Sequence, residues 1–165
     1  MVISGNFNLT LVVLSVVIAT ATSFTALDLA GRIRVSTGRS HKVWLVAAAV
    51  AMAGGIWSMH FVAMLAFVMP MPIAYDIGRT ALSLVVAILL TGVAFAIISG
   101  GRAAWKQVVL AGVLMGLGIC AMHYVGMSAM RMDATVTYAP ALVALSCAIA
   151  ACASVVGLWL ALKTT

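Results

Sequence analysis

The chain has very little charge, since only 7% of its 165 residues are charged and only three of these are acidic. A soluble globular protein normally has about 25% charged residues, so a conventional water-exposed surface is excluded. Cysteine is also scarce: Cys120, Cys147 and Cys152 lie within apolar segments and form no CxxC pair, which disfavours a disulfide framework. No nucleophile with a base, phosphate-binding glycine loop or pair of acids is present, so we expect this segment not to be an enzyme.

Apolar residues are abundant: 65% of the chain is hydrophobic and its mean hydropathy is +1.25. A helix of about 20 residues crosses a hydrocarbon core of about 30 Å. Five apolar runs have about this length, at residues 9–27, 43–67, 80–99, 108–130 and 140–162. We therefore predict an all-α integral membrane protein, a bundle of five transmembrane helices whose surroundings are the lipid bilayer.

Basic residues lie at the ends of these runs. Four of the nine are in the loop 31–42, and because Lys and Arg favour the cytoplasmic side of a membrane, this loop should lie inside. The same topology places Arg102, Lys106 and Lys163 inside and only Arg79 and Arg131 outside. The formal net charge of +6 is thus a topology signal, and we expect no binding of nucleic acid. The N-terminus is predicted outside and the C-terminus in the cytoplasm.

A ten-residue motif occurs twice. Residues 55–64 read GIWSMHFVAM, and residues 118–127, which start 63 positions later, read GICAMHYVGM. Each copy places one histidine, His60 or His123, in a segment apolar enough for lipid. Polar residues inside a membrane are costly and usually functional, so two copies at matching positions indicate a site.

The motif defines a repeat of about two helices. The first repeat covers about 9–67, the second about 80–130, and a third begins at about 140–162 without its motif. Tyr75 and Tyr138 keep the same offset of 63 residues. Because both repeats enter and leave on the same sides, they are parallel and should be related by an axis along the membrane normal. We expect the chain to be a segment of a longer protein, cut before further helices.

The histidines should lie in the outer part of the bilayer, about 22 to 26 Å from its inner boundary. Residues four apart share a helix face, so His60 with Met64 and His123 with Met127 each offer an imidazole and a thioether. Glycines at 54, 55, 112 and 116 are expected to bring the helices together. These soft ligands suit Cu(I), whereas zinc, magnesium and calcium sites would need more thiolates or oxygens. The candidate metal ligands are His60, His123, Met59, Met64, Met122, Met127 and Cys120.

Each candidate also has a simpler interpretation. A membrane histidine can fix helix packing through one hydrogen bond, and methionine and cysteine are ordinary apolar residues. Tyr75 and Tyr138 suit an interfacial aromatic belt. Asp28, Asp76 and Asp133 suit solvated helix ends.

The two motifs resemble the repeated Met-His-Tyr-Thr signature of the bacterial MHYT domain, a membrane sensory module. Gly55 to His60 and Gly118 to Tyr124 carry the match, with Met64 and Met127 four residues after each histidine. The sequence departs from the signature at Val62 and Val125, which replace Thr, and at Phe61, which replaces Tyr in the first copy.

The resemblance implies three such repeats and a metal, copper, near the periplasmic face of the bacterial inner membrane. It further implies sensing of O2, CO, NO, copper or redox state, and control of a cytoplasmic output domain in the same chain. That output would be cyclic-di-GMP turnover or a histidine kinase. A homodimer is left open.

Two other functions compete. His60 and His123 could be axial ligands of haem b in an electron-transfer protein, and a strong Soret band would distinguish haem from Cu(I). A copper or ion transporter is disfavoured because no polar residues mark a path through the inner halves of the motif helices.

Overall fold

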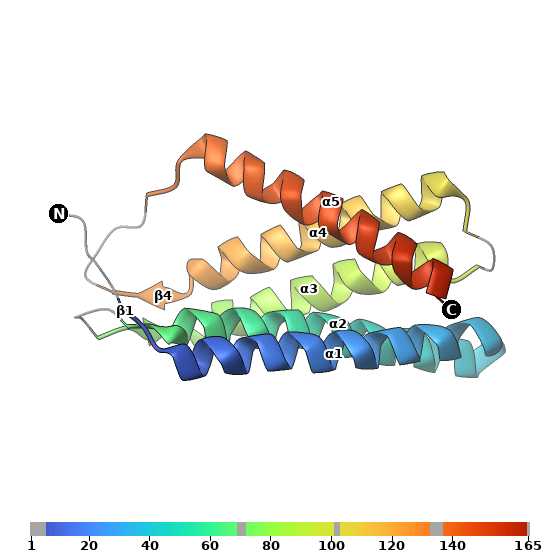
Figure 1. Ribbon diagram of the computed structural model, residues 1–165, viewed down its shortest axis with the longest axis horizontal. Helices are drawn as coiled ribbons and strands as arrows, with labels where there is room; N and C mark the ends of the chain where they lie inside the picture. Colours follow the sequence, from blue (N-terminus) through green and yellow to red (C-terminus); the bar gives the residue numbers. More distant parts are fainter. Residues whose placement is uncertain (1–5, 69–71, 101–102, 133–136, 165) are drawn as a thin grey trace.

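The computed structural model describes residues 6–68, 72–100, 103–132 and 137–164. Within these ranges the chain is an all-α membrane protein with five helices, each long and apolar enough to cross a bilayer. They are α1 (Leu9–Val35), α2 (Gly38–Ala66), α3 (Ile77–Ile98), α4 (Trp105–Met127) and α5 (Pro140–Thr164). The predicted fold class is confirmed. The helices run alongside one another, and β1 and the end of α5 lie at opposite ends of the bundle (Figure 1).

Four very short strands join the loops at one end of the bundle. They are β1 (Asn6–Phe7), β2 (Phe67–Val68), β3 (Ala74–Tyr75) and β4 (Met130–Arg131). β1 pairs antiparallel with β2, and β3 pairs antiparallel with β4, with Tyr75 opposite Met130. The second pair ties the loop after α2 to the end of α4. The apolar spans did not predict these strands, because a two-residue strand leaves no periodic pattern.

The first two helices are longer than predicted, because the expected basic loop at 31–42 is mostly helical. α1 continues to Val35 and α2 begins at Gly38, whose φ of 62° makes the tight turn between them. Within the extension Arg32 pairs with Asp28 at 2.9 Å, one helical turn apart, and its guanidinium lies 5.1 Å from the ring centroid of Trp44. Charged residues mark the end of the segment that can lie in lipid, but the helix itself can continue past them.

The remaining helices start or end within about one turn of the predicted limits. Asp76 accepts a hydrogen bond from the backbone N–H of Arg79 and caps α3, while the side chain of Gln107 accepts one from the N–H of Ala104 at the start of α4. Pro140 opens α5, as predicted, at a position that helices tolerate. The expected topology signal at Arg102 and the expected helix end at Asp133 lie outside the described residues.

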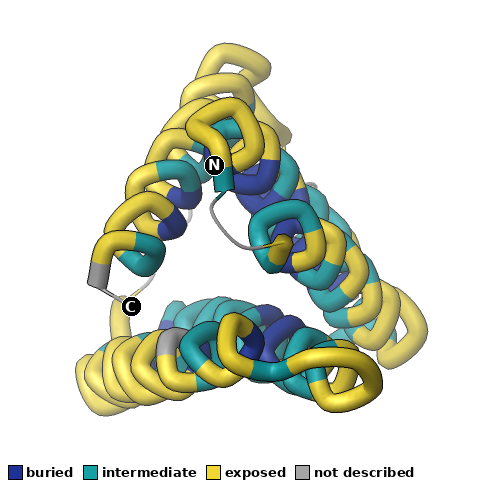
Figure 2. Tube along the Cα trace, turned by 90° about the vertical axis from the view of Figure 1, so that its right-hand side faces the viewer, coloured by how far each residue is buried: buried dark blue, intermediate teal, exposed yellow. Residues whose placement is uncertain are grey.

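Helices that follow one another in the sequence pack together: α1 with α2, α2 with α3, α3 with α4, and α4 with α5. By contrast, α2 and α4 make few contacts with each other. The main core lies where Ala48, Ala49, Ala94 and Ala111 let the helices approach around Phe95. Many large apolar residues are exposed, and Figure 2 shows that exposed residues lie on the outer sides of the helices, as expected for surfaces that face lipid.

The glycines bring together different helices from those expected. A Cβ at Gly112 would lie 2.5 Å from the side chain of Val155, and one at Gly116 would lie 2.5 Å from the Cα of Ala151, so this GxxxG face packs α4 on α5. Gly55 lies directly against Thr22 of α1. These glycines therefore do not draw the two motif helices toward each other.

Candidate functional site

The two motif histidines meet. His60 lies on α2 and His123 on α4, each within two turns of the helix end that bears the short strands. Their ring centroids are 4.8 Å apart and the ring planes are inclined at 63°. The sequence predicted that the two faces lie at equal depth and that glycines bring them together. The imidazoles do meet, although Gly55, Gly112 and Gly116 pack on other helices.

One nitrogen of this pair has no partner. Nε2 of His60 is buried, and no described protein atom lies within hydrogen-bonding distance in suitable geometry. A buried polar atom without a partner is unfavourable by about 1–3 kcal/mol, and such atoms are rare. The unpaired nitrogen is thus available to a ligand that enters between the helices.

Gly126, three residues after His123, makes the close approach of the helices possible. A Cβ at this position would stand 3.2 Å from Cζ of Phe61 and 3.4 Å from Nε2 of His60. The first motif has Ala63 at the equivalent position. Sequence reasoning missed the role of Gly126, although the glycine within the motif was a visible signal.

Aromatic rings surround the pair. Phe61 lies edge to face with His60 at 5.3 Å, and Trp57 lies 4.8 Å from Phe61. Trp57 is fixed in turn, because its indole N–H donates to Oγ of the fully buried Ser83 on α3 at 3.0 Å. On the other side Tyr124 lies 4.9 Å from His123. Bulky apolar groups therefore restrict water around the imidazoles.

The loop tyrosines repeat the same arrangement in both halves. Tyr75 lies edge to face with Phe61 at 6.0 Å, and Tyr138 lies edge to face with Tyr124 at 5.4 Å. The members of each pair are 14 residues apart, and the pairs are offset by 63. The tyrosines thus extend the aromatic shell of the site, beyond the interfacial anchoring expected of them. Their shared offset was the signal that connects them to the repeat.

The predicted sulfur ligands have different surroundings. Met122 is 1% exposed and packs in an apolar cluster with Ala53, Ala87 and Trp57. Cys120 is buried beside Cys147 of α5. Met59, Met64 and Met127 are half-buried. Across the described ranges no three His, Cys, Asp or Glu side chains form a group suited to a metal ion.

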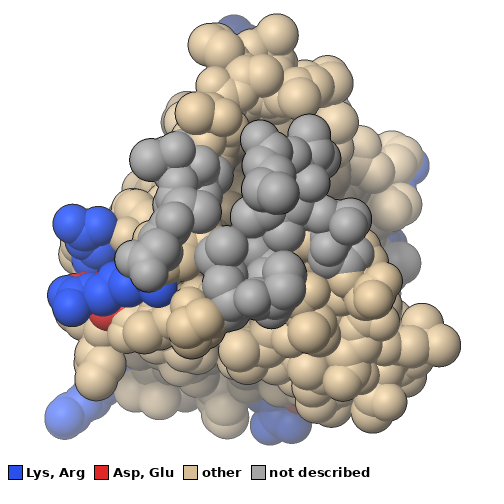
Figure 3. All heavy atoms as spheres, turned by 90° about the vertical axis from the view of Figure 1, so that its left-hand side faces the viewer, with Lys and Arg blue, Asp and Glu red and all other residues tan. Residues whose placement is uncertain are grey.

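A group of polar contacts between Asp76, Arg79, Ser128 and Arg131, called the polar latch below, lies at the same end of the bundle. The carboxylate of Asp76 accepts from Arg131 of β4, and Arg79 donates to the backbone oxygen of Ser128 at 2.7 Å. The backbone N–H of Arg79, followed by the Arg131 side chain, lowers the pKa of Asp76, whereas burial raises the pKa of Tyr75. Figure 3 shows this end of the molecule, with basic side chains beside an acidic one at one edge. The latch joins the loop after α2 to the exit of α4.

Fold and site together define a multi-pass membrane protein with a paired histidine centre between two repeated helices. The chain matches the family MHYT, described as "Bacterial signalling protein N terminal repeat", over residues 54–111 and 116–165. It belongs to this family. The segment is a sensory domain of a signalling protein and not an enzyme, as predicted.

Several curated proteins are similar to the chain. The "Bifunctional diguanylate cyclase/cyclic di-GMP phosphodiesterase MucR" of Pseudomonas aeruginosa is 44% identical over 96% of the chain and 23% of its own length. The "Cyclic di-GMP phosphodiesterase NbdA" of the same organism is 42% identical over 85% of the chain and 18% of its own length. The "Signaling protein YkoW" of Bacillus subtilis is 34% identical over 96% of the chain and 20% of its own length.

The chain thus spans less than a quarter of each of these relatives. The relatives are longer proteins, as the resemblance implied. No solved structure matches the chain.

Proposed function

We propose that the chain is a sensory input module that holds copper between α2 and α4, responds to a diatomic gas or to copper or redox state, and controls cyclic-di-GMP turnover. The observation that carries the proposal is the contact of His60 with His123, in which a buried Nε2 has no partner. The family and the names of two relatives support the signalling role and the cyclic-di-GMP output.

The donor set fits a soft metal ion. Imidazole nitrogen and thioether sulfur are ligands for Cu(I), whereas Mg²⁺ and Ca²⁺ favour carboxylate oxygens, and neither motif contains a carboxylate. His60 and His123 would hold the ion, with Met64 and Met127 on the same helix faces and Met59, Met122 and Cys120 as further candidates. Bound copper would supply a redox-capable centre to which a diatomic gas can bind.

The placement of the pair suits a switch. α2 and α4 make few contacts with each other, and the histidine pair is one place where they meet, so a bound ligand there would bear directly on the separation of these helices. α4 is packed against α5 through Gly112 and Gly116, which would carry its movement to the C-terminal helix. A ligand shifts such an equilibrium only if it binds one arrangement more tightly than the other. The difference in ligand affinity between the two helix arrangements would come from the residues around the histidine pair.

Haem b is the second cofactor candidate. A porphyrin held by His60 and His123 would have to fit between the two imidazoles. The rings already meet edge to face with their centroids 4.8 Å apart, which favours a single ion over a porphyrin. A visible spectrum separates the two, since haem gives a Soret band and Cu(I) does not.

The decisive experiment is metal analysis by mass spectrometry, with a visible spectrum, on the purified membrane protein. We expect near-stoichiometric copper in the unaltered protein and its loss in a His60→Ala, His123→Ala double variant. His41→Ala is the matched control, because His41 lies at the other end of the bundle, 3.1 Å from the oxygen of Ile33. Copper that persists in the double variant, or is absent from the unaltered protein, would refute histidine ligation.

We further propose that the chain lies in the bacterial inner membrane with its N-terminus in the periplasm and its C-terminus in the cytoplasm. Support comes from Lys106, Lys163 and the basic turn between α1 and α2, which share one end of the bundle. A green fluorescent protein fused after Thr165 should fluoresce, and alkaline phosphatase there should be inactive. The reverse pattern would invert the orientation.

A further inference from the structure

Two of the three cysteines meet where α4 packs on α5. The side chains of Cys120 and Cys147 interact across this contact, and both are free thiols. Cys120 is buried and Cys147 is half-buried, whereas Cys152, on the same helix as Cys147, is exposed. The proposed copper centre includes Cys120 only as a further candidate and does not use Cys147. The pair is therefore a group of two nucleophilic side chains without an assigned role.

The packing of the two helices explains why these cysteines meet. A Cβ at Gly116 would lie 2.5 Å from Cα of Ala151, so the backbones of α4 and α5 are in contact there. One turn further along α4 and one turn back along α5, the facing residues are Cys120 and Cys147. A disulfide needs Cα atoms about 4.4–6.8 Å apart, and helices whose backbones touch one turn away provide such an approach.

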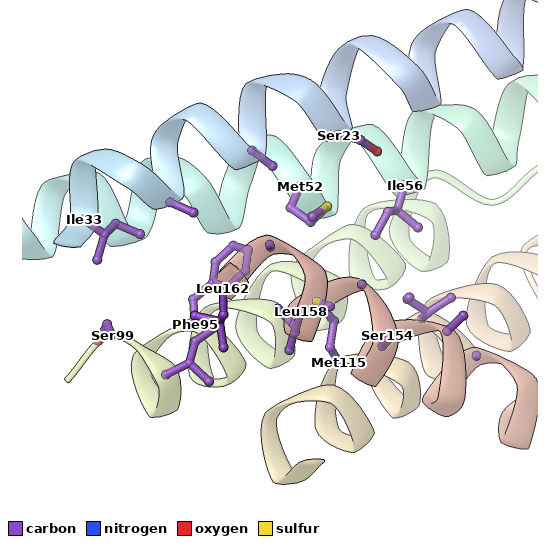
Figure 4. Close-up of a pocket in the computed structure, with 18 of the residues that line it drawn as sticks. Ser23, Ile33, Met52, Ile56, Phe95, Ser99, Met115, Ser154, Leu158 and Leu162 are labelled. Carbon is purple, nitrogen blue, oxygen red and sulfur yellow. The ribbon is translucent and has the colours of Figure 1, made fainter. Parts of the chain in front are cut away.

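Contacts on both sides of the pair hold the helices in this register. Toward the short strands, the hydroxyl oxygens of Tyr124 and Ser146 are 2.9 Å apart. On the other side, Met115 of α4 and Leu158 of α5 belong to one buried cluster and lie near each other in Figure 4. The cysteines thus face each other within a continuous helix contact, and a bond between them would form without a change of helix partner.

Cys120 and Cys147 also lie at the same depth. Cys120 is seven residues before the end of α4, and Cys147 is seven residues after the start of α5. Both are therefore about 10 Å from the end of the bundle that bears the short strands. In the proposed orientation this is the periplasmic half of the membrane, the side on which disulfides form and persist.

Packing alone does not explain two cysteines at these positions. In the first repeat, 63 residues earlier, the equivalent positions hold Trp57 and Leu84. The corresponding contact between α2 and α3 thus forms with two large apolar side chains in place of the thiols. The thiols supply chemistry that the helix contact does not require.

We propose that Cys120 and Cys147 form a disulfide when a lipid-soluble quinone oxidises them. Two S–H bonds break and one S–S bond forms, and the two electrons and two protons pass to the quinone, which becomes a quinol. The oxidant has to dissolve in lipid because both thiols lie within apolar spans.

Such a bond would fix α4 against α5 three residues before His123. It would restrict the movement that carries a change at the histidine pair to the C-terminal helix, and it would remove the Cys120 thiol from the candidate copper ligands. This consequence rests on the proposed function, whereas formation of the bond does not.

Counting of free thiols tests the proposal. The purified membrane protein is reduced with a phosphine, freed of copper with the chelator bathocuproine disulfonate and treated with decylubiquinone. Cysteines that remain as thiols are then alkylated in denaturant and counted by mass spectrometry. We expect the quinone to lower the count from three to one, with residues 120 and 147 joined within one chain. Because copper has been removed, the result is independent of whether the copper centre exists.

Cys152→Ser is the matched control, since Cys152 is exposed five residues after Cys147 on the same helix. The count of this variant should fall from two to none, whereas the counts of Cys120→Ser and Cys147→Ser should stay at two. The bond should also raise the midpoint of thermal unfolding, in the unaltered protein and in Cys152→Ser only. Three free thiols after treatment, a bond to Cys152, a bond between two chains or an unchanged midpoint would overturn the proposal.

Discussion

Arg131, at the end of β4, donates a hydrogen bond to the carboxylate of Asp76, which is also the N-cap residue of α3. One acidic side chain therefore joins the exit of the second motif helix to the start of the helix that follows the first. Arg79 strengthens the same junction through the backbone oxygen of Ser128. The histidine pair lies beneath this latch, so the latch restrains the helices that carry the site.

Acid should weaken this latch. The pKa of Asp76 is lowered from 3.8 by the N–H of Arg79 and by Arg131. A carboxyl group with a depressed folded pKa stabilises the fold above its unfolded pKa, and this contribution is lost as the pH falls through the folded pKa. We expect thermal stability in detergent to show no contribution from titration of Asp76 above about pH 5 and to fall below about pH 4.

Two variants separate this effect from general acid sensitivity. Asp76→Asn keeps a good helix cap but has no charge, so the decline below about pH 4 should become smaller. Asp28→Asn removes the exposed pair with Arg32 and should leave the decline nearly unchanged, because such surface pairs contribute little. An identical acid profile for Asp76→Asn and the unaltered protein would contradict this role of Asp76.

A larger residue at Gly126 should separate the histidines. Gly126→Leu introduces a side chain where even a Cβ would lie 3.2 Å from Phe61 and 3.4 Å from Nε2 of His60. We expect the copper content to fall to that of the double histidine variant while the protein still inserts and remains monodisperse. Gly54→Leu, which adds the same side chain to open space on α2, should retain copper. Equal copper in both variants would mean that the approach at Gly126 is not needed.

The membrane spans and the shared depth of the histidines could be predicted from the sequence, because each depends on a single strong constraint. Lipid requires an apolar segment of sufficient length, so runs such as 80–99 locate a helix to within about a turn. A repeat of 63 residues places His60 and His123 at similar depth, and parallel repeats bring such residues to one level of the bundle. Metal binding by these residues is still a prediction.

Helix ends and helix partners could not be predicted in the same way. The stretch from Asp28 to Val35 is too charged for lipid but remains helical, because hydropathy limits the segment that lies in lipid and not the backbone hydrogen bonds that form a helix. Gly112 and Gly116 predict close helix packing but not which helix packs against them. The structure shows that this helix is α5. The position of Met122 in an apolar cluster is likewise set by tertiary packing, since a methionine suits a core as well as a metal.

The hydrogen bond from Trp57 to Ser83 should stabilise the contact between α2 and α3. The donor–acceptor distance is 3.0 Å, and Ser83 is fully buried. Hydrogen bonds between membrane helices contribute about 0.6 kcal/mol on average and at most about 1.7 kcal/mol. A double-mutant cycle of Trp57→Phe and Ser83→Ala, measured by unfolding in mixed micelles, should give a coupling free energy in this range. Ser99→Ala removes only a bond within α3, and its coupling to Trp57→Phe should be zero.

The packing of α4 on α5 should be sensitive to a single methyl group. A Cβ at Gly116 would lie 2.5 Å from Cα and 2.6 Å from N of Ala151, and backbone atoms cannot move aside without displacing α5. We expect Gly116→Ala to lower the unfolding free energy by about 1–3 kcal/mol, the usual effect of overpacking. Gly54→Ala, in open space, should leave it unchanged or raise it by up to about 1 kcal/mol, because alanine favours helix more than glycine. If the two variants were equally stable, α4 and α5 could not be in backbone contact at this position, and the proposed route from the histidine pair to the C-terminal helix would be lost.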